Sequence, residues 1–262
     1  MTPAPAPVHD PVARRLALAA LVLAAVAFLS GSLDRPLTEA MLALPAAWAA
    51  PAKALTDLGK SHWYLVPAGL LALGAGAVAL RLPALRDRPW WGLAELGGFV
   101  FAAIAVSGIL IDILKPLLGR ARPKLLALEE FYGYRPLTFD ADFYSLPSGH
   151  ANTLLVLATL VALLAPRWRR WAFGVFGLLA LTRVVVGAHY LSDVVAGGAI
   201  AVATTLALAA WAAERGWVLR RRRDGRLALN ARQRWLKRHR WRWRVLLGLG
   251  VKAARETAVT GP

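Results

Sequence analysis

Apolar residues run in long blocks along the chain, and short polar segments rich in Lys and Arg separate them. A helix needs about 20 mostly apolar residues, within a range of roughly 17 to 25, to cross the hydrocarbon core of a bilayer. Six blocks meet or approach this length, at residues 16–32, 64–82, 92–114, 151–165, 171–187 and 191–213. No alternating apolar and polar pattern of β-strands recurs between them. We therefore predict an all-α fold, a bundle of six transmembrane helices.

A seventh apolar segment, residues 37–50, is interrupted by Pro45 and is too short to span comfortably. We expect it to lie at the membrane interface after the first helix. Arg14-Arg15 before the first block also fits the start of a cleaved signal peptide. We favour an uncleaved helix, because the leader is rich in Pro and no clear A-x-A site ends the block.

Small residues and charges refine this picture. Glycines inside the blocks permit the close helix contacts that supply much of the packing in a bilayer; they include Gly69, Gly74, Gly76, Gly97, Gly98, Gly174, Gly177, Gly197 and Gly198. The chain has no cysteine, which excludes disulfides, a Cys-based zinc site and a thiol nucleophile. A cytoplasmic N-terminus places most cations outside the blocks on the cytoplasmic side, as the positive-inside rule requires. Both termini are then cytoplasmic, in a cell inner (plasma) membrane.

The net charge of +17 raises the question of nucleic acid, but 15 of the 32 Lys and Arg residues lie in residues 215–255, after the last block. This distribution is typical of topology and of contact with an anionic inner leaflet, so we expect no nucleic acid partner. We divide the chain into a membrane domain, residues 1–213, and a basic Trp/Arg-rich cytoplasmic tail, residues 214–262. Partial disorder of the tail is an open alternative.

Three polar blocks border the apolar runs, and in this topology all three reach the outer, periplasmic face. Such convergence of separated segments is what a functional site requires. The blocks are Lys115 with Arg122-Pro123, then Pro147-Ser148-Gly149-His150, then Arg183, His189 and Asp193.

The residue types fit a phosphate. Lys115, Arg122 and Arg183 supply positive donors for non-bridging oxygens, although each one alone reads equally well as a snorkelling cation at a helix end. Ser148 is a plausible N-cap and Gly149 allows close backbone approach, so the free N–H groups of this helix start favour an anion. Capping explains these two residues without any ligand, but it leaves His150, a candidate general acid, unexplained.

His189 and Asp193 are four residues apart and share a face if a helix begins here. A carboxylate bonded to one imidazole nitrogen leaves the other free as a nucleophile, which suits a phosphohistidine intermediate. The alternative is an interfacial histidine with Asp193 as an ordinary acid at a helix start. Asp112 lies one turn before Lys115 and is placed to pair with it. We interpret Arg120 and Lys124 as snorkelling cations, although either could assist the site electrostatically.

The ordered set K-x6-R-P, P-S-G-H and R-x5-H-x3-D resembles the type 2 phosphatidic acid phosphatase (PAP2) superfamily, in its membrane lipid phosphatase branch. The resemblance implies His189 as nucleophile, Asp193 as its partner and His150 as acid. It implies phosphate ligands and no metal or cofactor; the ligands are Lys115, Arg122, Ser148, Gly149 and Arg183. The family usually has Ser before the arginine of the third block, where this chain has Thr182. The soluble vanadium haloperoxidase branch shares the blocks, but the apolar spans argue against it.

These expectations describe a membrane phosphatase with a lipid phosphate substrate. Undecaprenyl diphosphate, phosphatidylglycerol phosphate, phosphatidic acid and lipid A phosphates remain open. Aromatic residues between the first two polar blocks suit either a lipid at headgroup depth or a packed interfacial loop. A phosphotransferase using the same site and a non-catalytic lipid-phosphate binder are the alternative classes.

Overall fold

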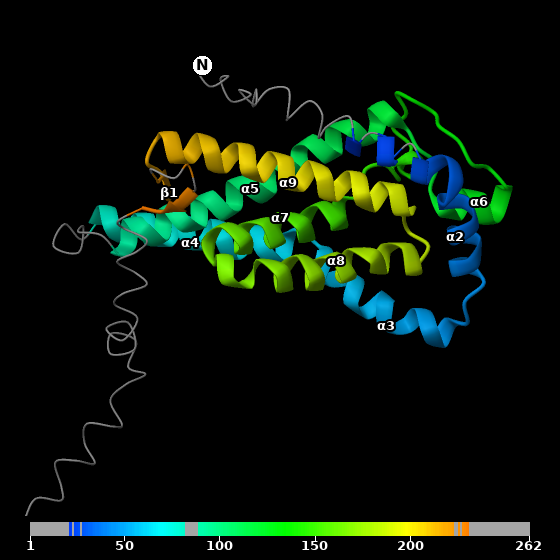
Figure 1. The fold of residues 1–262 in the computed structure, drawn as a ribbon, viewed down its shortest axis with the longest axis horizontal. Coiled ribbons are helices and arrows are strands. Elements are labelled where there is room, and N and C mark those ends of the chain that lie inside the picture. Colours follow the sequence, from blue (N-terminus) through cyan, green and yellow to red (C-terminus); the bar gives the residue numbers. More distant parts are fainter. Residues whose placement is uncertain are drawn as a thin grey trace, which may run out of the picture. The chain divides into compact units, whose positions relative to one another are not determined.

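The computed structural model describes residues 21–81, 89–222, 225 and 227–230, apart from residues 23 and 27. Helices dominate these residues (Figure 1). The α-helices are α2 (Asp34–Leu42), α3 (Ala46–Thr56), α4 (His62–Arg81), α5 (Pro89–Leu118), α6 (Pro123–Glu129), α7 (Gly149–Leu164), α8 (Arg169–Val185) and α9 (Leu191–Glu214). Short 3-10 turns are η1 (Asp57–Gly59), η3 (Ala141–Phe143) and η4 (Pro166–Trp168), and the strands are β1 (Leu219–Arg221) and β2 (Leu227–Leu229).

Five predicted blocks coincide with helices α4, α5, α7, α8 and α9. Among the described residues, three helical stretches have the length and apolar composition to cross a membrane, at Ala49–Arg81, Trp90–Leu118 and Leu191–Glu214. Helices α7 and α8, with 16 and 17 residues, are shorter. The first block is helical at residues 21–22, 24–26 and 28–32, whereas residues 16–20 lie outside the described part. The chain is thus an integral membrane protein, and six spans stay a prediction.

The segment predicted at the interface forms the end of α2 and the start of α3. Pro45 separates the two helices, because its extended backbone (φ −55°, ψ 142°) caps α3 and cannot continue a helix. Both short helices contact α8, so the early chain packs on a helix far along the sequence. Its place relative to a bilayer stays a prediction.

The described chain forms two compact units, and the first comprises residues up to 65 and 102–208. In this unit α7 and α8 lie side by side, and α2 and α3 contact α8 (Figure 1). Their shared apolar core consists of Ala151, Leu154, Ala180, Val184 and Val194. Every candidate site residue belongs to this unit.

The second unit comprises residues 66–101 and 209–262. A Cβ at Gly97 would lie 2.8 Å from the backbone oxygen of Ala68 and the backbone nitrogen of Ala72, so α5 meets α4 backbone to backbone. The prediction of close helix contact is confirmed at Gly97. It is wrong at Gly74, Gly174 and Gly177, where an added Cβ would meet nothing within 4 Å.

The all-α prediction is wrong after α9. Strand β1 pairs antiparallel with β2, with Leu219 opposite Leu229 and Arg221 opposite Leu227. The chain turns between them at Gly225, whose φ of +76° favours glycine. Strands of three residues are too short for an alternating pattern to reveal them. Residues 231–262, most of the predicted basic tail, lie outside the described residues.

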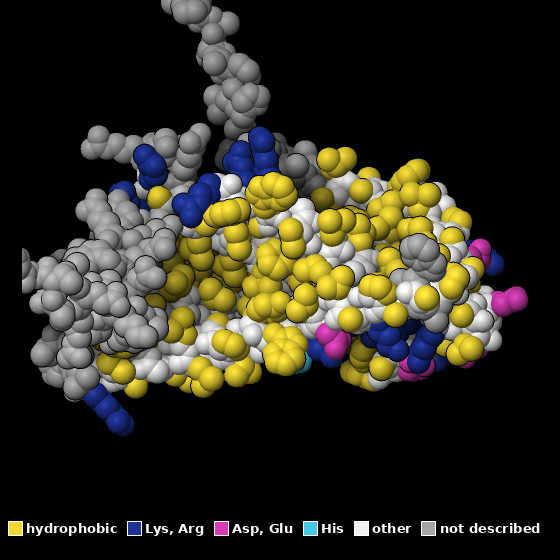
Figure 2. Space-filling model, turned by 90° about the horizontal axis from the view of Figure 1, so that it is seen from below, with side chains coloured by type: hydrophobic (Ala, Val, Ile, Leu, Met, Phe, Trp, Pro, Cys, Tyr) yellow, Lys and Arg dark blue, Asp and Glu magenta, His cyan; other side chains and the backbone are white. Residues whose placement is uncertain are grey.

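Many large apolar side chains of the helices are exposed, and hydrophobic side chains cover much of the face shown in Figure 2. Leu73 of α4 is 75% exposed, and Leu178 and Trp171 of α8 are each 69% exposed. A water-facing surface rarely carries apolar patches of this extent. These side chains suit contact with lipid.

Candidate active site

The first polar block lies at the end of α5. Lys115 occupies the last turn, and its Nζ donates to Oδ1 of Asp112 at 3.0 Å, which confirms the predicted pair. Its Nζ is also 3.4 Å from where a Cβ of Gly149 would be, so Lys115 lies against the second polar block. Beyond α5 the chain turns at Gly119 (φ +58°), where a Cβ would overlap the carbonyl of Arg135.

Arg122 follows this turn in an extended conformation, and Pro123 then begins α6. The backbone N–H of Arg122 donates to the carbonyl of Asp142 at 2.8 Å, and its Nε donates to the carbonyl of Ala141 at 3.0 Å. Two bonds to one loop therefore fix both the backbone and the direction of the guanidinium.

The second polar block begins α7 and contacts α9, which lies later in the chain. Ser148 caps α7, since its Oγ accepts from the N–H of Ala151 at 3.4 Å, and the predicted N-cap is confirmed. The N–H of Ser148 donates to the carbonyl of Asp193 at 3.0 Å. On α9, a Cβ at Gly197 would lie 2.4 Å from the carbonyl oxygen of Ser148, so the two backbones are in direct contact.

His150 packs against η1, because a Cβ at Gly59 would lie 2.9 Å from its Cβ and Cδ2 atoms. It is close enough to Arg183 and His189 to interact with them electrostatically. A histidine expected to act as an acid therefore lies beside the expected nucleophile.

Arg183, in the last turn of α8, donates from Nη1 to Oγ1 of Thr56 at 3.0 Å. Its buried Nε has no hydrogen-bond partner in the structure. The hydroxyl of Thr182 donates to the carbonyl of Leu179, 2.6 Å away in the same helix, so the departure from the family pattern does not bear on the site. Thr56 itself carried no signal in the sequence.

His189 is 3% exposed, between α8 and α9. Its Nδ1 lies 2.7 Å from the carbonyl oxygen of Ser145 and 3.7 Å from Oδ2 of Asp193. Because a carbonyl oxygen only accepts, Nδ1 carries the proton and Nε2 has the free lone pair. The sequence predicted a direct hydrogen bond between His189 and the carboxylate of Asp193. In the structure Nδ1 of His189 instead donates to the backbone carbonyl of Ser145.

Burial lowers the pKa of His189 from its ordinary value; Asp193 opposes this shift, and the charges of Arg183 and Arg122 reinforce it. The imidazole is thus kept neutral, as a nucleophile requires. Arg122 and Arg183 therefore lie close enough to His189 to act on its charge, although Arg122 precedes α6 and Arg183 lies in the last turn of α8.

Asp193 is fully buried in the first turn of α9. Its Oδ2 accepts from Oγ of Ser145 at 2.6 Å and from the N–H of Tyr190 at 2.9 Å, while its Oδ1 accepts from Nη1 of Arg120 at 2.6 Å. The carboxylate therefore has strong donors on both oxygens and lies beside the imidazole without bonding to it.

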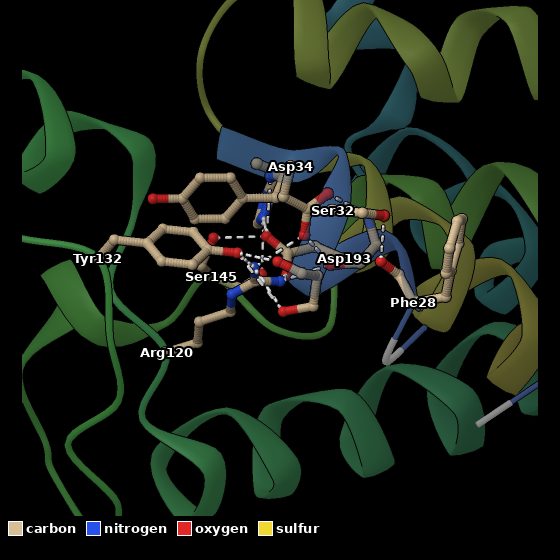
Figure 3. Close-up of polar contacts among 11 residues, drawn as sticks. Phe28, Ser32, Asp34, Arg120, Tyr132, Ser145 and Asp193 are labelled. Carbon is tan, nitrogen blue, oxygen red and sulfur yellow. Dashed lines mark hydrogen bonds and ion pairs between the residues drawn. The ribbon is translucent and has the colours of Figure 1, made fainter. Parts of the chain in front are cut away.

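The interpretation of Arg120 as a snorkelling cation is wrong, since its side chain is 1% exposed and bridges two buried carboxylates (Figure 3). Besides Asp193, it donates from Nη2 to Asp34 at 2.8 Å and to the hydroxyl of Tyr132 at 2.9 Å. Burial alone would lower the pKa of Arg120, but Asp193 and Asp34 outweigh it and raise the pKa above its ordinary value.

Among the described residues, no group of three or more His, Cys, Asp and Glu side chains is arranged to hold a metal ion. The clustered cations are instead suited to an anion. Catalysis without a metal or cofactor stays a prediction.

Lys115 thus lies against Gly149, and Arg122 and Arg183 lie near His189. This arrangement defines an integral membrane protein with a cluster of cations suited to an anion. Residues 96–217 match the PAP2 superfamily, so this part of the chain belongs to the superfamily. All the candidate residues lie within the matched region, whereas Asp34 and Thr56 precede it.

Two relatives are lipid A 1-phosphatases. The one from Rhizobium etli is 35% identical over 154 residues, which cover 58% of this chain and 66% of the relative. The one from Rhizobium johnstonii is 34% identical over 158 residues, covering 60% of this chain and 62% of the relative. The chain thus spans a little less than two thirds of these relatives.

An undecaprenyl-diphosphatase from Sulfolobus acidocaldarius is 30% identical over 105 residues, which cover 39% of this chain and 48% of the relative. Among solved structures, the transmembrane PAP2-type phosphatidylglycerolphosphate phosphatase from Bacillus subtilis is similar, with a TM-score of 0.48 and 19% identity, covering 73% of this chain and 94% of that one.

Proposed function

We propose that the protein is a membrane lipid phosphatase that hydrolyses a lipid phosphate monoester or diphosphate through a phosphohistidine at His189. The observation that carries this proposal is the 2.7 Å contact between Nδ1 of His189 and the carbonyl of Ser145. It leaves Nε2 as the nucleophilic nitrogen, in the neighbourhood of Arg122 and Arg183.

In the first step, Nε2 of His189 attacks phosphorus while the bond to the leaving oxygen breaks, and His150 donates a proton to that oxygen. Lys115, Arg122 and Arg183 hold the non-bridging oxygens, whose charge grows in the transition state. The N–H groups at the start of α7, with Ser148 and Gly149, add neutral donors at a positive helix end. Asp193 stabilises the imidazole as it becomes positively charged.

In the second step, water attacks the phosphorus of the phosphohistidine, and His150 accepts its proton. The P–N bond breaks, inorganic phosphate leaves, and Nε2 regains its lone pair. A second lipid in place of water would make the enzyme a phosphotransferase, which product analysis with an acceptor lipid detects.

The names of the relatives suggest the substrate, and we propose lipid A 1-phosphate first and undecaprenyl diphosphate second. Apolar side chains of the loop before the second block support a substrate at the membrane surface, since Phe139 is 89% exposed and Leu137 73% exposed. The distribution of cations supports an active site on the periplasmic face of the inner membrane, with both termini and the basic tail at the cytoplasmic leaflet.

The test is phosphate release in detergent from lipid A 1-phosphate, undecaprenyl diphosphate, phosphatidylglycerol phosphate and phosphatidic acid. Wild-type protein should release phosphate from at least one of them with EDTA present, and His189→Ala should not. Exposed Arg35→Met serves as a control for expression and folding. Equal activity of His189→Ala and wild type would refute the mechanism, and complete loss of activity in EDTA would refute metal independence.

A further inference from the structure

The ion pairs buried beside His189 contain more charged side chains than the proposed phosphate chemistry requires. Arg120 contributes one positive charge, and Asp34 and Asp193 contribute two negative charges, all three at 1% exposure or less. Buried charges are costly to leave unpaired, so a second carboxylate on an already paired arginine calls for an explanation.

Asp34, like Asp193, accepts hydrogen bonds on both of its carboxylate oxygens. Its Oδ1 accepts from the N–H of Ser192 at 3.0 Å, and its Oδ2 accepts from Nη2 of Arg120 at 2.8 Å and from the hydroxyl of Ser192. Nη1 of Arg120 donates to the same hydroxyl at 2.6 Å. Asp34 and Asp193 therefore share one guanidinium (Figure 3), and the hydroxyl of Ser192 bonds to both Asp34 and Arg120 in the same hydrogen-bonded unit.

We propose that Asp34 and Arg120 are positioning residues for His189 that act through Asp193. Paired with Arg120 alone, Asp193 would present a neutral ion pair to the imidazole. With Asp34 binding the other branch of the guanidinium, the unit keeps one net negative charge beside His189. That charge stabilises the imidazole when it becomes cationic during attack, which deepens the phosphatase mechanism proposed above and rests on it.

Other charged groups also lie near His189. Arg183 comes from α8 and Arg122 from the start of α6, and both disfavour a positive charge on the imidazole. His150 of α7 also interacts with His189 electrostatically. The net negative charge of Asp34, Arg120 and Asp193 opposes the effect of these cations. Asp34 reaches this unit from α2, outside the region that matches the superfamily.

Single and double variants separate charge from structure. Asp34→Asn makes the unit neutral, Arg120→Met makes it doubly negative, and the double variant restores one net negative charge. We expect Asp34→Asn to lower kcat by about 10- to 100-fold, the range given by losing one charge-assisted hydrogen bond, and to move the acid limb of kcat/KM to lower pH. Arg120→Met should move that limb to higher pH, and the double variant should return it towards wild type.

Matched controls lie on the exposed face of α2, where Arg35 and Glu39 form an ion pair at 2.9 Å. Glu39→Gln and Arg35→Met repeat the same charge changes and should leave the pH profile unchanged. If Arg120→Met does not fold, Asp34→Asn and the double variant still decide the matter.

An unchanged acid limb in Asp34→Asn, with activity lower or equal, would overturn the proposal, because a merely structural role lowers the amount of active protein without moving the limb. His189→Ala, measured alongside, keeps the two questions apart. If it is as active as wild type, the proposed function fails whatever Asp34 does. If it is inactive while Asp34→Asn behaves as wild type, the function stands and this inference fails.

Discussion

Replacing Gly197 by alanine tests whether α9 positions the second polar block. The added Cβ would lie 2.4 Å from the carbonyl oxygen of Ser148 and 3.2 Å from its backbone nitrogen. Carbon–oxygen contacts are about 3.3–3.6 Å, so the two backbones must separate by about 1 Å. No side-chain rotation relieves this clash, because the opposing atoms are backbone.

The substitution should change the stability and the catalytic rate by different amounts. Overpacking of this kind costs about 1–3 kcal/mol, and the better helix propensity of alanine returns about 1 kcal/mol, so stability should fall by roughly 0–2 kcal/mol. A displacement of about 1 Å in a catalytic group lowers the rate on the order of 100-fold. Activity should therefore fall far more than stability.

The assay compares kcat/KM for phosphate release with the thermal unfolding midpoint, followed by the fluorescence of the 11 tryptophans, since the chain has no cysteine for thiol dyes. Gly174→Ala on α8 is the matched control, because its Cβ would meet nothing within 4 Å, and it should behave as wild type. Wild-type kcat/KM in Gly197→Ala would refute the reasoning that this backbone contact sets the position of Ser148.

Three further predictions follow from the site. Ser145→Ala removes the hydroxyl that bonds Asp193 and keeps the carbonyl that bonds His189, so kcat should fall by roughly 10-fold or more with little change in KM; a change confined to KM would contradict this. Thr56→Val releases the guanidinium of Arg183 and should raise KM about 5-fold, measured by steady-state kinetics, whereas an unchanged KM would show that this bond is not needed. Because burial lowers the pKa of His189 below 6.5, its nucleophilic form persists to lower pH. The acid limb of kcat/KM should lie below pH 6.5, and a limb above that value would contradict the shift.

Features governed by nearby residues were predictable from the sequence. The length of an apolar run determines a membrane helix, so α4, α5 and α9 were expected close to their observed ends. The N-cap at Ser148 and the pair of Asp112 with Lys115 depend on spacings of three residues, which helix geometry fixes.

Features governed by distant residues were not predictable. Arg120 looks like any cation at a helix end, and its burial depends on Asp34 and Asp193, which are 86 and 73 residues away along the chain. Similarly, the carbonyl of Ser145 that orients His189 is a backbone group 44 residues distant, and no side-chain pattern marks it. Such contacts exist only after the helices pack.

The linkage of Asp34, Arg120 and Asp193 has a consequence for how the protein is made. Asp34 leaves the ribosome early and Asp193 late, and Asp34 binds Ser192 across 158 residues of chain. Until the segment that becomes α9 has been inserted, Arg120 lacks one of its two carboxylates and His189 lacks its neighbouring Asp193. A nascent or truncated chain that stops short of this helix therefore has no assembled centre, and the proposed phosphatase activity would begin only when α9 docks.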